Sequence, residues 1–151
     1  MTVTDIQFSS NSKLIAFCCD DSSNGVLNTM SHKVEHCFFD LDKNLPCVST
    51  SISLNDNLLA AGSQEGTFVV RSLKDKTIVL TDKSVKAQIT FVRFSPTSNK
   101  TLAVAYSSGH ICLWDMHQKL LKQKFSAHAQ ACTGLAFSPV NNLLMCSVGL
   151  D

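Results

Sequence analysis

The sequence predicts an all-β chain in which one unit of short strands occurs four times. A strand, a polar turn and a more apolar strand follow one another in four segments, at 3–18, 48–63, 89–107 and 132–148. The last bulky apolar residue of the first strand recurs at intervals of 46, 40 and 43 residues, at Phe8, Leu54, Phe94 and Phe137. Helical periodicity is weak almost everywhere in the chain. Repetition at this interval indicates a fold built of stacked units.

Composition limits both the class of protein and its partners. The chain has 151 residues, of which 44% are hydrophobic and 17% are charged, and these values are typical of one folded domain. A formal net charge of +1 gives no basic excess for nucleic acid, which we do not expect as a partner. The longest apolar run, residues 14–19, is far shorter than the ~18 residues of a membrane helix, so we expect no membrane contact.

The N-terminal segment and the cysteines predict the compartment. The sequence MTVTDIQFSS has neither the basic nor the apolar region of a secretory signal, so we expect a cytoplasmic or nuclear protein. Seven cysteines are spread along the chain, and in a reducing compartment most of them should be free thiols that pack as small hydrophobic residues.

The four units are expected at 1–43, 44–84, 85–126 and 127–151, the last of them incomplete. A period of about 40–45 residues with four strands in each unit is typical of a blade of a β-propeller. In two units the sequence Phe-Ser-Pro ends the first strand, because proline cannot continue a central strand and favours a turn, at 94–96 and 137–139. The apolar run after this turn is the second strand.

Turns with glycine separate the second strand from the third, because glycine tolerates the positive φ of a tight hairpin. These turns lie at 22–26, 63–67 and 107–111. The third strands are expected at 26–30, 67–71 and 110–114. More polar fourth strands are expected at 34–39, 77–80 and 120–125.

Residues 117–125 are the one segment for which a helix is an alternative. A helix there would expose Leu120 or Leu121 on a lysine-rich face, so we favour a strand. The lysines of this segment are interpreted as a charged outer strand that discourages edge pairing, in preference to a patch for a partner, at Lys119, Lys122 and Lys124.

Three short motifs resemble the WD40 repeat: Leu-Trp-Asp at 113–115, Ala-His at 127–128 and Phe-Ser-Pro in two units. The resemblance implies a partial WD40 β-propeller of about three and a half blades in an open arc. It places Trp114 and Asp115 at the end of a third strand. It also implies a hydrogen-bonded set of His128, Ser147 and Asp151 in the last unit, whose tryptophan would lie beyond the end of the chain. We therefore expect the chain to be part of a longer protein.

The chain departs from the WD40 pattern at several positions. Ala127 stands in place of the glycine before the histidine, and Ser108 in place of the turn aspartate. Val85 and Leu45 occupy the histidine positions of two earlier units, and Arg71-Ser72 replaces Trp-Asp in the second. These blades must depend more on apolar packing than on the polar set.

Metal and catalytic sites are not expected. Cys18, Cys19, His32 and His36 approach the spacing of a zinc finger, but adjacent cysteines on a strand point to opposite faces. The chain has no G-x-S-x-G elbow and no phosphate-binding glycine loop, so we predict no cofactor and no enzyme activity. Ser95-Pro96 and Ser138-Pro139 match minimal kinase sites, but the repeat already explains them as turns.

The C-terminal part, residues 137–151, resembles the WD-repeat proteins of centrosome and spindle that target gamma-tubulin ring complexes. The resemblance is carried by Phe-Ser-Pro-Val-Asn at 137–141 and Gly-Leu-Asp at 149–151. It implies a protein-binding scaffold whose partners are this complex or other centrosome and spindle components, located at the centrosome or spindle pole. The alternatives are a WD40 subunit of another assembly, in ubiquitin ligation or RNA processing, and a propeller enzyme.

Overall fold

The computed structural model describes residues 1–39, 41, 44–141 and 144–151, which form fourteen strands and no helix. The first sheet contains β1 (Val3–Phe8), β2 (Leu14–Cys19), β3 (Asn24–Asn28) and β4 (Lys33–Phe38). The second contains β5 (Cys47–Ile52), β6 (Leu58–Ser63), β7 (Phe68–Ser72) and β8 (Ile78–Asp82). The third contains β9 (Ile89–Phe94), β10 (Thr101–Tyr106), β11 (His110–Asp115) and β12 (Leu120–Ser126), and the last contains β13 (Cys132–Phe137) and β14 (Met145–Gly149).

The first three sheets are antiparallel meanders and the last is an antiparallel hairpin, and all four share one irregularity. Near the start of the first strand, one residue is skipped in the pairing with the second strand, which marks a β-bulge. The skipped residues are Thr4, Val48, Thr90 and Thr133. A bulge at the same place in every sheet shows that the four units are structural repeats and not only similar sequences.

The pairing registers identify the equivalent residues. The first strands end at Phe8, Ile52, Phe94 and Phe137, and these residues pair with Ile15, Leu59, Leu102 and Met145. The expectation that Leu54 is the second anchor was therefore wrong, because Leu54 lies in the turn after β5. Ile52 and Leu54 are both apolar and two positions apart, so the sequence pattern alone does not distinguish them. With Ile52 in its place the intervals become 44, 42 and 43 residues.

Most other strands lie within two residues of their expected positions, and residues 120–126 form a strand rather than a helix. The third strand of the first sheet was expected at 26–30 but spans Asn24–Asn28. The Asn28 side chain ends it, because its oxygen accepts the backbone N–H groups of Met30 and Ser31 at 2.9 and 3.0 Å.

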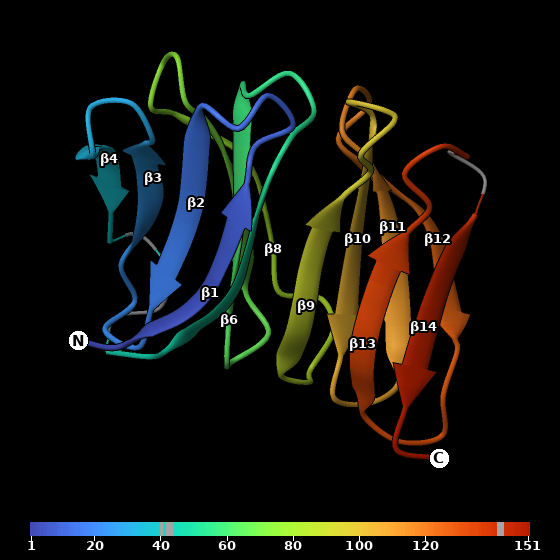
Figure 1. Ribbon diagram of the computed structural model, residues 1–151. Coiled ribbons are helices and arrows are strands. Elements are labelled where there is room, and N and C mark those ends of the chain that lie inside the picture. Colours follow the sequence, from blue (N-terminus) through green and yellow to red (C-terminus); the bar gives the residue numbers. More distant parts are fainter. Residues whose placement is uncertain (40, 42–43, 142–143) are drawn as a thin grey trace.

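The sheets pack face to face in a row, with the first and last sheets at opposite ends (Figure 1). The first strands β1, β5, β9 and β13 lie next to one another at the inner side. The largest apolar cluster lies between the second and third sheets and includes Phe68, Leu102, Val104 and Trp114. Smaller clusters fill the other two interfaces. The arrangement is a partial, open β-propeller.

The two outermost faces of the row remain uncovered by any other described sheet. On β1, Ile6 and Phe8 are 61% and 59% exposed, although their counterparts Thr50 and Ile52 in the second sheet are buried. On the last sheet, Val148 is 58% exposed. No helix in the described part of the chain is long and apolar enough to cross a membrane.

Candidate functional site

The inner strands are joined by side chains that bond to the backbone of the next strand. Asp5 and Gln7 of β1 accept the N–H groups of Thr50 and Ile52 at 3.0 and 3.2 Å. The equivalent residues of β5, Ser49 and Ser51, accept the N–H groups of Val92 and Phe94 at 3.1 and 2.9 Å. The same two positions therefore link the first sheet to the second and the second to the third.

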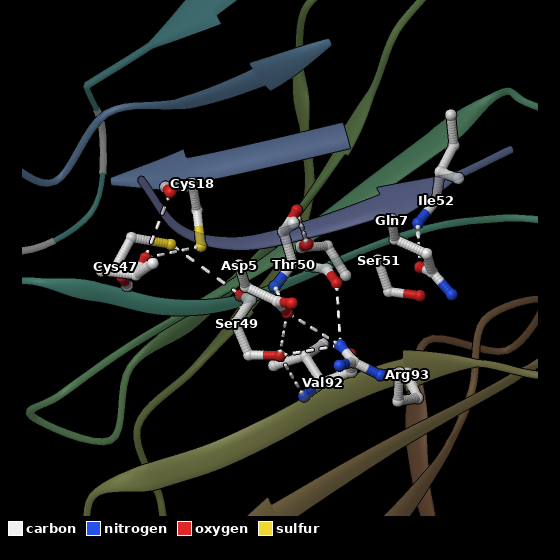
Figure 2. Close-up of polar contacts among 12 residues, drawn as sticks. Asp5, Gln7, Cys18, Cys47, Ser49, Thr50, Ser51, Ile52, Val92 and Arg93 are labelled. Atoms are coloured by element: carbon white, nitrogen blue, oxygen red, sulfur yellow. Dashed lines mark hydrogen bonds and ion pairs between the residues drawn. The ribbon is translucent and has the colours of Figure 1, made fainter. Parts of the chain in front are cut away.

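Arg93 of β9 joins three inner strands at one point (Figure 2). Its Nη1 donates to Asp5 Oδ2 at 3.0 Å, to Ser49 Oγ at 2.9 Å and to the carbonyl oxygens of Thr50 and Val92. Asp5 also accepts the Ser49 hydroxyl at 2.9 Å. Residues 88 positions apart in the sequence thus form an ion pair across β5.

The ion pair is partly shielded from water, since the Arg93 and Asp5 side chains are 22% and 19% exposed. Its charges are therefore screened less than those of a surface pair. Beside Arg93 lies a recess of about 220 Å³, which Gln7, Phe94, Leu135 and Phe137 also line. This recess combines one cation and an amide with an apolar floor.

The last sheet contains a second polar set. His128, in the loop before β13, lies between Ser147 of β14 and Asp151, two residues after that strand. Its Nε2 is 2.9 Å from Ser147 Oγ, and its Nδ1 is 2.9 Å from Asp151 Oδ1. Asp151 also accepts the backbone N–H of Ala129 at 3.0 Å. The hydrogen bond from Ala129 is the main cause that lowers the pKa of the Asp151 carboxyl, and the contact with His128 lowers this pKa further.

Trp114 lies apart from this set, one sheet earlier. Its ring packs edge-on against Phe68 with 5.3 Å between centroids, and its Nε1 has no hydrogen-bond partner within the described residues. Asp115 ends β11 and accepts the N–H groups of His117 and Gln118 at 2.8 and 2.9 Å. The backbone bond from Gln118 is the main reason why the pKa of Asp115 is lowered.

The substitutions of the WD40 pattern have clear structural consequences. Arg71 occupies the place equivalent to Trp114, with its guanidinium 4.1 Å from the centroid of the Phe38 ring. It also donates to the Lys76 carbonyl at 3.0 Å. Burial lowers the pKa of Arg71. A cation and an aromatic ring thus replace the apolar contact that Trp114 makes with Phe68.

The residues considered for a metal are not brought together. Cys18 is buried beside Cys47, whereas His32 lies in an exposed turn and His36 stacks on Phe38. The hydrogen bond with Cys18, together with burial, raises the pKa of the Cys47 thiol. Within residues 1–39, 41, 44–141 and 144–151, no group of three His, Cys, Asp or Glu side chains is arranged to hold a metal ion.

The Asp5–Ser49–Arg93 network was not anticipated from the sequence. The signal that could have found it is a polar residue one or three positions before the last residue of the first strands β1, β5 and β9. Asp5, Gln7, Ser49, Ser51 and Arg93 stand at these positions. Their partners lie more than forty residues away and only the stacking of sheets reveals them.

The family follows from the match of residues 50–144 to the sequence model of the anaphase-promoting complex subunit 4 WD40 domain. The chain belongs to the WD40-repeat family. The human protein NEDD1 is 26% identical to it over 137 residues, which cover 85% of this chain and 20% of NEDD1. Topless-related protein 3 of Arabidopsis thaliana is 27% identical over 71% of this chain and 9% of its own length.

A third relative, human WD repeat-containing protein 36, is 28% identical over 54% of this chain and 9% of its own length. The chain thus spans a fifth or less of the length of each of these relatives. WD40 domains mediate protein–protein contacts and are generally scaffolds without catalytic activity. The WD40 fold thus supports a role as a protein-interaction scaffold.

Proposed function

We propose that this chain is a non-catalytic WD40 adaptor that takes part in recruiting gamma-tubulin ring complexes to the centrosome and spindle. The observation that carries the proposal is the similarity to NEDD1, which extends over 85% of the chain. It is supported by the C-terminal segment 137–151, whose sequence resembles centrosomal and spindle WD-repeat proteins. The final Asp151 of this segment holds His128 in place.

The architecture is suited to such a role. The sheets bury their apolar faces against one another, and Arg93 fastens the inner strands, so loops at both ends of the sheets are held on a rigid base. As parts of this proposal, the repeats divide at residues 43, 84 and 126. Trp114, Asp115, His128, Ser147 and Asp151 serve as structural positions that shape the binding surface.

The second candidate is a WD40 subunit of another assembly, such as a ubiquitin ligase or an RNA-processing complex. Topless-related protein 3 and WD repeat-containing protein 36 are 27% and 28% identical to the chain, and NEDD1 is 26% identical. These similar identities favour a general adaptor. The two candidates differ in where the protein is found and in which complex it enters.

Microscopy of the tagged protein in dividing cells, with gamma-tubulin stained in the same cells, tests the proposal. We expect enrichment at spindle poles and co-purification of gamma-tubulin. The control is a Gly109→Val variant, because the crowded turn at Gly109 cannot accommodate a valine side chain. Enrichment that depends on the folded sheets should be lost in this variant. A diffuse nuclear signal, or pole enrichment that the variant retains, would contradict the proposal.

A further inference from the structure

The third sheet carries an excess of positive charge that the other sheets lack. Residues 85–126 contain six basic residues and one acidic residue, so their formal net charge is +5. Residues 1–43 have three basic and six acidic residues, residues 44–84 have four of each, and residues 127–151 have a single acidic residue and no basic one. Charge gathered on one unit of a nearly neutral chain indicates a surface for a partner of opposite charge.

Four of these cations lie along the outer border of the third sheet. We name them the lysine surface: Lys100, Lys119, Lys122 and Lys124. Lys119 directly precedes β12, the outermost strand of this sheet, and Lys122 and Lys124 belong to it (Figure 1). Lys100 lies at the end of the sheet where β12 begins, since its carbonyl accepts the N–H of Met116 at 2.7 Å. At about 3.3 Å per residue, the stretch from Lys119 to Lys124 spans about 17 Å.

The lysine surface has no acidic counterpart within the chain. All four lysines are exposed, and none of them forms an ion pair with another described residue. Asp115, the one acidic residue of this unit, instead accepts the backbone N–H groups of the turn that follows β11. The positive charges are therefore available to a partner.

Protection of a sheet edge does not account for these lysines. Charged side chains on an outer strand discourage pairing with a second edge, and β4 and β8 are outer strands of the same kind. The positions in β4 and β8 that correspond to Lys122 and Lys124 carry no positive charge. The pairing registers identify them as Glu35, Cys37, Val79 and Thr81. Two sheets of the same chain thus have outer strands without lysines at these positions.

An apolar side chain lies among the lysines. Leu121 pairs with Trp114, and Lys124 pairs with Cys112, so Leu121 and Lys124 lie on the face that packs against the second sheet. Leu121 is nevertheless 42% exposed. Residues 117–126 present no exposed Phe, Tyr or Trp ring on which a base could stack, which favours a protein segment over nucleic acid as the partner.

We propose that the lysine surface binds an extended, acidic segment of a partner protein. Carboxylates at every second or third position of the segment pair with Lys119, Lys122 and Lys124, and an apolar side chain between them covers Leu121. Complementary charge of this kind speeds association and selects the partner, whereas each exposed ion pair adds little affinity. The inference deepens the adaptor role and rests on it, because it states the chemistry of a partner segment.

The probe is a fluorescein-labelled peptide of sequence EDLEDLED, and its control is the uncharged peptide QNLQNLQN with the same label. Binding to the 151-residue chain is measured by fluorescence anisotropy at neutral pH and low ionic strength. We expect saturable binding of the acidic peptide that is about tenfold tighter than binding of the control peptide. Added salt should weaken binding of the acidic peptide and leave that of the control peptide unchanged.

Paired variants test the place of binding. Lys122→Glu combined with Lys124→Glu should weaken binding of EDLEDLED about tenfold, because two attractions become repulsions. The matched control, Lys13→Glu combined with Lys33→Glu, makes the same change of net charge at exposed positions of the first sheet and should alter the affinity less than about twofold. Lys122→Gln combined with Lys124→Gln removes the charges without adding repulsion and should weaken binding about threefold.

Cross-linking on the unmodified chain gives a result that does not depend on the folding of any variant. A carbodiimide joins carboxylates of the bound peptide to adjacent lysine amines, and mass spectrometry should find the new amides at Lys119, Lys122 and Lys124. Cross-links mainly at other lysines, no saturable binding at millimolar peptide, or equal losses in the two charge-reversal variants would overturn the inference. Tighter binding of oligouridine or of phosphatidylserine vesicles to the same lysines would also overturn it. Localisation in cells is independent of these assays, so this inference and the proposed function can fail separately.

Discussion

Removal of the Asp5 carboxylate should destabilise the stack of sheets, because this group connects the first three inner strands. Asp5→Ala eliminates the bonds to Ser49 Oγ and to Thr50 N, and the ion pair with Arg93, at 2.9, 3.0 and 3.0 Å. Hydrogen bonds to a charged acceptor contribute about 1.5–3 kcal/mol each, whereas loss of one partner of a fully buried ion pair costs about 3–5 kcal/mol.

Two features reduce this cost. Arg93 loses its counter-ion but keeps its bonds to Ser49 and to the carbonyls of Thr50 and Val92, so its guanidinium stays hydrogen-bonded. Both side chains are also about one fifth exposed, so water can replace part of what is lost. We therefore expect Asp5→Ala to lower the free energy of unfolding by about 2–3 kcal/mol.

Urea unfolding followed by circular dichroism measures this change, and the midpoint should fall while the slope stays constant. Asp5→Asn is the matched control, because its amide oxygen can still accept from Ser49 and Thr50 while the charge is lost. It should cost about 1 kcal/mol. A change below about 0.5 kcal/mol for Asp5→Ala, or an equal loss in both variants, would refute the reasoning that hydrogen bonds between inner strands stabilise the stack.

Three further predictions concern single residues. Gly109→Ala should lower the melting temperature by several degrees, because φ is +78° and the new Cβ would lie 2.1 Å from the His128 carbonyl oxygen; an unchanged melting temperature would contradict this turn geometry. A thiol reagent should modify the exposed Cys37 and Cys146 first in the native protein, and the five buried cysteines only after unfolding. Rapid modification of all seven cysteines would contradict the burial of these five side chains between the sheets. The pKa of the Asp151 carboxyl, followed by NMR, should lie below ~3.9, the usual value for aspartate. The stabilisation that the ionised carboxylate provides is therefore present above that pH and is lost as the pH falls through the lower pKa of the folded state. A titration midpoint at the usual value would show that the hydrogen bond from Ala129 to Asp151 does not form in solution.

The repeats could be predicted from the sequence because each unit carries its own local signal. Alternating strands, Phe-Ser-Pro turns and glycine hairpins depend on neighbouring residues, so the strands at 110–115 and 120–126 were found within one residue. The errors arose where two residues gave the same local signal. Leu54 and Ile52 are both apolar and two positions apart, and only the pairing of Ile52 with Leu59 distinguishes them.

The polar network could not be predicted in the same way. Asp5 and Arg93 are 88 residues apart, and nothing in the local pattern of β1 or β9 indicates that their side chains meet. Local periodicity determines strands, whereas contacts between sheets depend on the shape of the whole row.

A crystal structure of the chain tests the central claim, the stacking of equivalent sheets, most directly. We predict that Phe8, Ile52, Phe94 and Phe137 end four adjacent inner strands, and that Arg93 reaches over β5 to within hydrogen-bond distance of Asp5. Inner strands that are not neighbours, or an Arg93 side chain turned away from Asp5 and Ser49, would contradict the account.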